Sequence, residues 1–113
     1  MAGPYVPERG DAVWLDFSPK LGHEQRGRRP ALVLSPRAYN RRVGLALFCP
    51  VTTRVKGYPF EVLVPEGSKL EGAILSDQVK SLDWRSRRAV LLCRIPDAVL
   101  EEVLGRIQAL LAG

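Results

Sequence analysis

The residues best suited to chemistry gather in one short polar segment, between positions 18 and 30. This segment holds one imidazole, one carboxylate and three guanidinium groups, from His23, Glu24, Arg26, Arg28 and Arg29. A carboxylate can accept a proton, and guanidinium groups bind phosphate oxygens through a planar set of donors. Polar loops of about a dozen residues in compact domains are usually functional or disordered. The composition favours a functional loop over a mobile surface loop with incidental charges.

Positive charge extends well beyond this segment. Between Gln25 and Phe60 the sequence has no acidic residue and eight basic ones, and a second basic stretch from Lys80 to Arg94 is opposed only by Asp83. The whole chain carries a formal charge of +5. Such clustering favours a polyanionic partner, because Lys and Arg on a nucleic acid gain Coulomb energy and release condensed counterions. On charge alone, a solvated basic surface that improves solubility is an equal alternative.

Hydrophobic patterning predicts the scaffold that must position these groups. Alternating or short apolar runs, separated by Gly, Pro and charged turns, predict strands at 13–17, 31–35, 45–51, 60–64, 73–75, 79–84 and 89–93. Many short strands with close turns are typical of a small antiparallel barrel or sandwich. Pro50 is expected to mark a strand end or an edge position, because proline cannot donate to a ladder.

The end of the chain changes period. Its apolar residues from Val99 to Leu111 fall on one broad helical face. Pro96 and Asp97 form a plausible helix start, since proline is tolerated in the first turn and an acid there complements the helix dipole. We therefore expect a terminal helix of about four turns on the barrel. With 113 residues, the chain is expected to form a single domain over 1–113.

The composition also argues against several classes of protein. A chain that is 46% hydrophobic and 26% charged is neither disordered nor fibrous in character. Charged residues such as Glu8 and Asp11 interrupt the first twenty positions, so a secretory signal is not expected, and no run approaches transmembrane length. We expect a soluble cytoplasmic protein without a membrane partner.

The two cysteines do not suggest a metal site. Cys49 and Cys93 sit in apolar runs without CxxC spacing, and the chain has one histidine, which argues against zinc. Two buried free thiols are the preferred interpretation. A disulfide between them is left open by spacing alone, although cytoplasmic redox conditions would disfavour it.

Five segments of the chain resemble the MazF/PemK family of toxins in order and spacing. They read GDAVWLDF at 10–17, GHEQRGRRPALVLS at 22–35, CPVTT at 49–53, KGYPFE at 56–61 and SDQVKSLDWR at 76–85. The resemblance implies an SH3-like antiparallel barrel with a C-terminal α-helix, the CcdB/MazF-like plasmid maintenance toxin fold, assembled as a homodimer. It implies a sequence-specific, metal-independent endoribonuclease (an mRNA interferase) that cuts single-stranded RNA without a cofactor. It also implies a cognate antitoxin whose acidic, flexible segment crosses the basic surface.

The resemblance assigns the catalytic residues. Arg29 and Thr52 match the family's catalytic arginine and threonine. Metal-free cleavage uses the neighbouring 2'-hydroxyl as nucleophile, so the protein must deprotonate it, stabilise a phosphorane and protonate the leaving 5'-oxygen. By resemblance, the products are 2',3'-cyclic phosphate and 5'-hydroxyl ends. Arg29 suits phosphorane stabilisation, whereas a proton-transfer role conflicts with a pKa above about 12 and is left open. Thr52 suits a hydrogen bond to a non-bridging oxygen.

The general base is assigned on chemical grounds. Glu24 is anionic at neutral pH and gains basicity on partial desolvation, so it is the better base; positioning Arg29 or accepting from a base edge are its alternatives. His23 has an ordinary pKa near neutrality but is not a fixed member of the family motif, so it is more readily an exposed loop residue than a general acid. Arg28 stands where some relatives carry histidine, which weakens any imidazole mechanism there and suits phosphate contact.

Recognition of single-stranded RNA needs aromatic faces and base-edge hydrogen bonds beside a basic channel. The predicted RNA-binding residues are Gln25, Arg28, Thr53, Lys56, Tyr58, Gln78, Lys80 and Ser81. Trp14 and Trp84 could stack on bases, but core or dimer packing is at least as well supported. The basic trio Arg85, Arg87 and Arg88 could contact phosphates or a partner, or could guard a strand edge with charge.

Two functions of other classes stay open at this point. One is a gyrase-targeting toxin on the same fold, which would bind a protein and cut nothing. The other is a barrel that binds RNA without cleaving it. The intact segments 25–30 and 52–53 favour the ribonuclease, because a gyrase poison would not need them.

Overall fold

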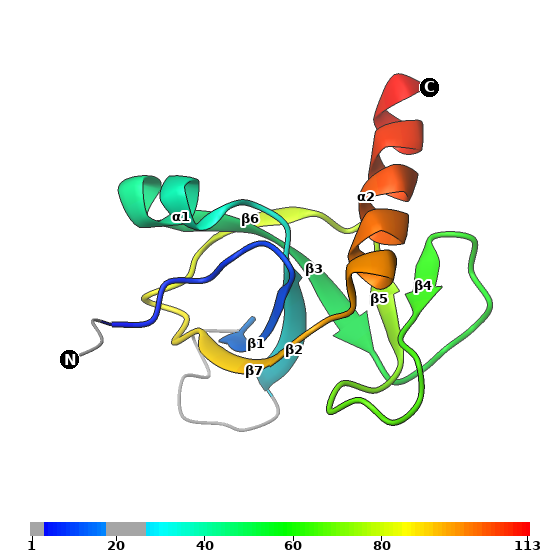
Figure 1. The fold of residues 1–113 in the computed structure, drawn as a ribbon, viewed down its shortest axis with the longest axis horizontal. Helices are drawn as coiled ribbons and strands as arrows, with labels where there is room; N and C mark the ends of the chain where they lie inside the picture. Colours follow the sequence, from blue (N-terminus) through cyan, green and yellow to red (C-terminus); the bar gives the residue numbers. More distant parts are fainter. Residues whose placement is uncertain (1–3, 18–26) are drawn as a thin grey trace.

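The computed structural model describes residues 4–17 and 27–113, which form an antiparallel sheet with two helices (Figure 1). In this part of the chain the sheet has seven strands, in the order β4-β5-β3-β2-β1-β7, with β6 paired to β3 off this path. The strands are β1 (Asp11–Asp16), β2 (Arg28–Val33), β3 (Leu45–Thr52), β4 (Glu61–Leu63), β5 (Ala73–Leu75), β6 (Lys80–Asp83) and β7 (Val90–Arg94). The helices are α1 (Arg37–Val43) and α2 (Asp97–Ala112). The predicted mainly-β architecture with a terminal helix is confirmed.

The long strand β3 joins the two parts of the sheet. Its first half pairs with β6, where Phe48 lies opposite Lys80, and its last residues pair with β5, where Thr52 lies opposite Ala73. Along its other side it pairs with β2. In Figure 1, β3 runs from the side of α1 and β6 towards β4 and β5. The end of β3 is therefore the point where the barrel meets the β4–β5 hairpin.

Both faces of the central strands are buried. Ala12 and Leu32 belong to a hydrophobic core that α2 covers, whereas Val13 and Phe48 belong to a second core that includes Trp84. Neighbouring residues along a strand point to opposite faces, so each of these strands needs apolar residues in both registers. This explains the nearly continuous apolar runs of the sequence.

Every strand except β2 begins and ends within two residues of its predicted bounds. Strand β2 begins at Arg28, before the predicted 31–35, because Trp14 to Asp16 of β1 pair with Arg28 to Pro30. Pro50 does not mark a strand end, because it lies inside β3 and pairs with Ala31, but it does occupy a local edge position, as the alternative prediction had it. It is tolerated there because it lies between the stretch that pairs with β6 and the stretch that pairs with β5.

Helix α1 was not predicted, and a buried polar residue anchors it. The Asn40 side chain is fully buried, where its amide nitrogen donates to the carbonyls of Pro7 and Ser35, both at 2.9 Å. Its amide oxygen accepts a hydrogen bond from the Ser35 hydroxyl at 2.6 Å. The helix ends at Gly44, whose φ of 81° is in the left-handed region. Anchoring by hydrogen bonds leaves no hydrophobic periodicity to detect.

The structure bears on the predictions for Trp84 and for the two cysteines. The Trp84 indole is buried and donates to the Asn40 carbonyl at 3.0 Å, so Trp84 is a core residue. Both thiols are free, with Cys49 buried and Cys93 half-buried. Strands β2 and β1 lie between β3, which carries Cys49, and β7, which carries Cys93, so the two thiols are not on neighbouring strands.

Across residues 4–17 and 27–113, neither helix has the length and apolarity needed to span a bilayer.

Candidate functional site

Two clefts meet at the end of β3. The first, here called the Arg29 cleft, has a volume of about 340 Å³ and is lined by Arg29, Pro30, Val51, Thr52, Thr53, Arg54 and Glu71. The second, here called the Lys56 cleft, has a volume of about 460 Å³ and is lined by Thr52, Arg54, Lys56, Gly57, Tyr58, Glu61, Leu75 and Gln78. Thr52 and Arg54 line both clefts, so the two clefts adjoin at the end of β3.

Strand pairing brings the predicted catalytic residues together. Strands β2 and β3 are antiparallel, with Ala31 opposite Pro50. Continuing this register by two residues brings Arg29 of β2 to the level of Thr52 at the end of β3. Both residues also line the Arg29 cleft, so a guanidinium and a hydroxyl from distant parts of the sequence share one cleft.

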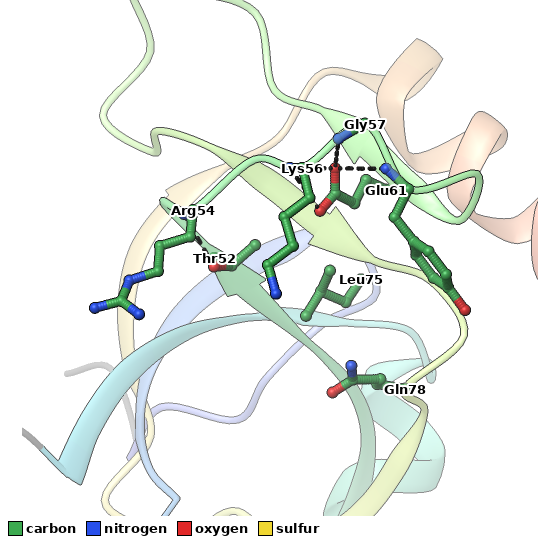
Figure 2. A pocket seen from close by; sticks show the side chains of 8 residues that line it. Thr52, Arg54, Lys56, Gly57, Glu61, Leu75 and Gln78 are labelled. Carbon is green, nitrogen blue, oxygen red and sulfur yellow. Dashed lines mark hydrogen bonds between the residues drawn. The ribbon is translucent and has the colours of Figure 1, made fainter.

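The hydroxyl of Thr52 is held by the backbone that follows it. Its Oγ1 accepts a hydrogen bond from the Arg54 amide at 3.1 Å (Figure 2). A hydroxyl has one donor hydrogen, and this bond uses only an acceptor lone pair. The Thr52 hydroxyl can therefore still donate to an oxygen bound in the cleft.

Gly72 allows β5 to approach Thr52 closely. A Cβ at position 72 would lie 2.9 Å from the carbonyl carbon of Thr52 and closer still to its oxygen. The φ of Gly72 is +105°, which L side chains rarely adopt. A glycine at this position is therefore a condition for the observed placement of Thr52.

The backbone of the loop between β3 and β4 is organised by one carboxylate. Glu61 accepts hydrogen bonds from the amides of Lys56 at 3.1 Å, Gly57 at 2.9 Å and Tyr58 at 3.2 Å. Figure 2 shows the Lys56 side chain extending towards the space between Thr52 and Leu75, with Gln78 across the cleft. The loop thus presents a cation on one side of the Lys56 cleft and an amide on the other.

Tyr58 is held in place from its phenol end. Its hydroxyl donates to Asp77 Oδ2 at 2.8 Å, and its ring centroid lies 5.9 Å from that of Phe60. The hydrogen bond to Asp77 raises the pKa of the Tyr58 hydroxyl. The Tyr58 side chain stays 47% exposed, so part of its aromatic surface remains available to a base. Within the described residues, the second oxygen of Asp77 is buried without a hydrogen-bond partner.

Arg28 has internal partners. Its guanidinium bonds to Asp16 Oδ1 at 2.8 Å and to the Arg88 carbonyl at 2.6 Å, and only 15% of its side chain is exposed. Arg88 in turn bonds to Asp16 Oδ2 at 2.7 Å. The hydrogen bond from Arg88, followed by that from Arg28, lowers the pKa of the Asp16 carboxyl. Arg28 lines neither cleft, so its predicted contact with RNA has no counterpart in the site geometry.

The other two arginines of the basic trio are also engaged. Arg87 donates to the carbonyls of Asp16 and Phe17, both at 3.1 Å. The Arg85 guanidinium carbon lies 4.8 Å from the centroid of the Trp84 ring. These contacts favour a structural role for Arg87 and a stacking role for Arg85.

The remaining predicted residues fall into three groups. Thr53, Lys56, Tyr58 and Gln78 line the clefts as expected. Lys80 and Ser81 are exposed on β6, beside β3 and outside both clefts. Glu24, Gln25 and His23 lie outside the described residues.

Sequence reasoning missed three carboxylates of the site. Glu71 lines the Arg29 cleft, Glu61 organises the loop, and Asp77 binds Tyr58. Glu61 and Asp77 stand inside the matched motifs, which was the one available signal, whereas Glu71 lies outside all of them. In the part of the chain that the structure describes, no cluster of three His, Cys, Asp or Glu side chains is arranged to hold a metal ion.

Comparison with known proteins places this geometry in a family. Residues 8–111 match the family model described as "PemK-like, MazF-like toxin of type II toxin-antitoxin system". The chain is 45% identical over 111 residues to the endoribonuclease toxin MazF of Escherichia coli K12, covering 98% of this chain and 99% of that protein. It is 41% identical over 108 residues to the endoribonuclease toxin ChpB of the same strain, covering 90% of this chain and 91% of that protein.

Solved structures agree with the sequence comparison. A crystal structure of MazF from Deinococcus radiodurans superimposes with a TM-score of 0.88 at 56% identity, covering 97% of this chain and all of that one. MazF in a MazE–MazF complex from the same organism gives 0.87 at 52% identity, covering 96% of this chain and 98% of that one. With matched sequence, fold and order of motifs, the chain belongs to the PemK-like, MazF-like toxins of type II toxin–antitoxin systems.

Proposed function

We propose that this chain is the endoribonuclease toxin of a type II toxin–antitoxin pair, neutralised by its cognate antitoxin. The observation that carries the proposal is that Arg29 and Thr52 line one cleft at the end of β3. The curated relatives are named endoribonucleases, and the Deinococcus radiodurans toxin has been crystallised with a MazE partner. The substrate is single-stranded RNA, cut in a sequence-specific way.

The proposed chemistry uses the RNA's own 2'-hydroxyl as nucleophile. Attack on the adjacent phosphorus gives a phosphorane, and loss of the 5'-oxygen leaves a 2',3'-cyclic phosphate and a 5'-hydroxyl. The Arg29 guanidinium stabilises the charge of the phosphorane. The Thr52 hydroxyl, fixed by the Arg54 amide, donates to a non-bridging oxygen. Neither role requires a metal ion.

Two carboxylates compete for the role of general base. Glu24 remains the proposed base, because it is a carboxylate, anionic at neutral pH, and stands in the matched motif. Glu71 is a second candidate, because it lines the cleft that contains Arg29 and Thr52. Glu24→Gln and Glu71→Gln variants separate them: the base is the residue whose loss removes the acidic limb of the pH profile of kcat/KM.

Base recognition is assigned to the Lys56 cleft and its flanks. Lys56 and Gln78 offer a cation and an amide from opposite sides, and Tyr58 offers an aromatic surface. Thr53, Lys80 and Ser81 extend the polar surface from the cleft along β6, with Gln25 from the polar loop as a further contact. A homodimer and an acidic antitoxin segment across the basic clefts complete the proposed assembly.

Cleavage in excess EDTA tests the function. We expect the purified protein to cut a mixed-sequence single-stranded RNA at defined positions, with 5'-hydroxyl ends. Retention of RNA without cuts would indicate a binding protein, and neither cuts nor retention would point to a protein target such as gyrase. Loss of cutting on chelation alone would overturn the metal-free chemistry.

Substitutions test the site. Arg29→Ala and Thr52→Ala should each abolish cutting while folding and dimerisation are retained, whereas Arg42→Ala on the distant helix α1 should cut normally. An RNA with a single 2'-deoxy nucleotide at the mapped scissile position should resist cleavage there. Cleavage of that substrate, or normal rates in either site variant, would contradict the assignment.

A further inference from the structure

Glu61 places a negative charge in a cleft proposed to bind a polyanion. Its side chain lines the Lys56 cleft together with Lys56 and Arg54, and its residue is half-buried. A carboxylate there repels RNA phosphates, so by electrostatics alone it weakens substrate binding. A contribution of Glu61 to the structure of the cleft would offset this repulsion.

That contribution is visible in the backbone of the loop. The Glu61 carboxylate receives three consecutive amide donors, from Lys56, Gly57 and Tyr58, at 2.9–3.2 Å (Figure 2). Hydrogen bonds to an ionised acceptor are roughly twice as strong as neutral ones. The same three residues carry the cation and the aromatic ring of the cleft, so Glu61 controls where both are presented.

Arg106 holds the same loop from its outer side. Its guanidinium donates to the Pro59 carbonyl and pairs with Glu102 at 2.8 Å, one turn away on α2. It lines a separate hollow of about 280 Å³ with Val55, Gly57, Tyr58, Pro59, Glu61 and Leu63, and it does not line the Lys56 cleft. Arg106 can therefore act on the cleft only through the loop.

We propose that Glu61 and Arg106 are positioning residues that hold the Lys56–Pro59 loop in its RNA-binding conformation and thereby set which bases are accepted. The inference rests on the proposed ribonuclease function. Neither residue takes part in the chemical step, since Arg29 lines only the adjoining cleft and the Glu61 carboxylate is engaged by the loop amides.

The sign of the KM change on Glu61→Ala separates positioning from simple charge repulsion. Removing a negative charge would lower KM if repulsion were its main effect, whereas loss of loop order raises KM. We expect KM for an RNA with one mapped cleavage site to rise about tenfold, with kcat changed less than about twofold. Glu61→Gln keeps an acceptor but loses the charge, so its KM should lie between those of the unmodified protein and Glu61→Ala. Glu101→Gln, an exposed acid on α2, is the matched control with an unchanged KM.

Variants of Arg106 give an independent test, because Arg106 does not line the Lys56 cleft. Arg106→Ala should raise KM and broaden the set of cleaved sequences, and Arg106→Lys should recover part of the loss. Arg41→Ala removes the same charge from exposed helix α1 and controls for net charge. A KM that falls in Glu61→Ala, or an Arg106→Ala enzyme no different from Arg41→Ala, would overturn the inference while leaving the ribonuclease intact.

Amide hydrogen exchange tests the loop without RNA. The Lys56, Gly57 and Tyr58 amides should exchange slowly in the unmodified protein and at least about tenfold faster in Glu61→Ala, with amides of β3 unchanged. Unchanged exchange would overturn the positioning role whatever the enzyme does. If the unmodified protein cuts no RNA, the proposed function fails and the inference fails with it; if it cuts RNA with unaltered KM and sequence choice in both variants, only the inference fails.

Discussion

Thr52 belongs to both clefts, and its placement depends on a residue that has no side chain. Gly72 is the residue immediately before β5. It lies against the Thr52 carbonyl and has a positive φ. The obstacle to any larger residue is backbone, which cannot rotate away as a flexible side chain can. The observed position of Thr52 thus depends on the close approach of the segment that leads into β5.

We predict that Gly72→Ala lowers the free energy of unfolding by more than about 2 kcal/mol and reduces cleavage per folded molecule. Two effects add: the strain of positive φ and the collision with Thr52. Gly67→Ala is the matched control, because Gly67 has a φ of +91° and no atom within 4 Å of an added Cβ. It should cost only about 1 kcal/mol. Urea denaturation measures both, and equal costs would contradict the close approach.

The two thiols should differ in reactivity. Burial raises the pKa of Cys49 to about 12, and it also raises that of the half-buried Cys93. Since the thiolate is the reactive form, we predict that iodoacetamide at pH 8 modifies Cys93 slowly and Cys49 only after unfolding. Peptide mass mapping of native and urea-treated protein, with Cys93→Ser as control, checks this. Modification of Cys49 in the native protein at the rate of Cys93 would refute it.

For individual residues, the sequence indicated those that act through the chemistry of their own side chains. Arg29 and Thr52 could be named because a guanidinium and a hydroxyl stand in matched motifs, and both line one cleft. Glu61 could not, because its contribution is made by three amides that any residues would carry. Arg28 shows the converse: its charge suggested a phosphate contact, but its partner is Asp16, which only the β1–β2 pairing brings near.

Asp16 ties several elements together. It ends β1, bonds Arg28 at the start of β2, and bonds Arg88 in the turn that leads to β7. This turn and β2 flank the end of the sheet where Arg29 is carried. The ion pairs at Asp16 therefore support the strand that carries Arg29.

The stability that Asp16 contributes should depend on pH. Its pKa is lowered in the folded protein by Arg88 and Arg28, so the contribution is fully present above the unfolded value of about 4 and is lost as the pH falls through the lower folded value. We predict that Asp16→Asn costs about 2 kcal/mol near neutral pH and progressively less below about pH 4. Urea denaturation between pH 8 and pH 3 measures the difference.

A second variant makes that difference specific. The carboxyls of Glu8 and Asp83 also have lowered pKa values, through backbone amides of Arg37 and Ser86 respectively, so the whole protein loses stability in acid. The Asp16→Asn variant keeps Glu8 and Asp83. Subtracting its free energy of unfolding from that of the unmodified protein at each pH therefore isolates the contribution of Asp16. Glu101→Gln on the surface of α2 should show no such dependence. If the difference in free energy of unfolding between Asp16→Asn and the unmodified protein stayed constant down to pH 3, that result would be inconsistent with the ion pairs.

Elements were predictable where they bury apolar residues periodically. Helix α2 and the strands have such periodicity, and their approximate positions follow from it. Helix α1 has little, because its buried residue is Asn40, and its stability comes from hydrogen bonds to Pro7 and Ser35. Contacts between segments that are distant along the chain leave no local pattern.

At the scale of the whole molecule, hydrophobic patterning left barrel and sandwich unresolved. The deciding feature is β3, which exchanges one partner for another along its length, from Leu45 opposite Asp83 to Thr52 opposite Ala73. No window of sequence encodes that exchange. The resemblance to a family supplied the topology, and the same exchange creates the junction at which the clefts open.

The cationic side chains that line the clefts should govern how salt affects RNA binding. Among the described residues these are Arg29, Arg54 and Lys56. If each neutralises one phosphate, the logarithm of the binding constant should fall against the logarithm of salt concentration with a slope of about −2, at about −0.7 per phosphate contact on single strands. Binding is measured on an RNA that carries a 2'-deoxy nucleotide at the scissile position, so that no cleavage occurs.

Single substitutions locate that salt dependence. Lys56→Gln should make the slope shallower by about 0.7, because one counterion-releasing contact is lost. Arg42→Gln removes a charge of the same sign from exposed helix α1, so it should lower affinity slightly through the general field and leave the slope unchanged. If both variants change the slope equally, RNA is bound by a diffuse basic surface, and the assignment of its path to the end of β3 is wrong.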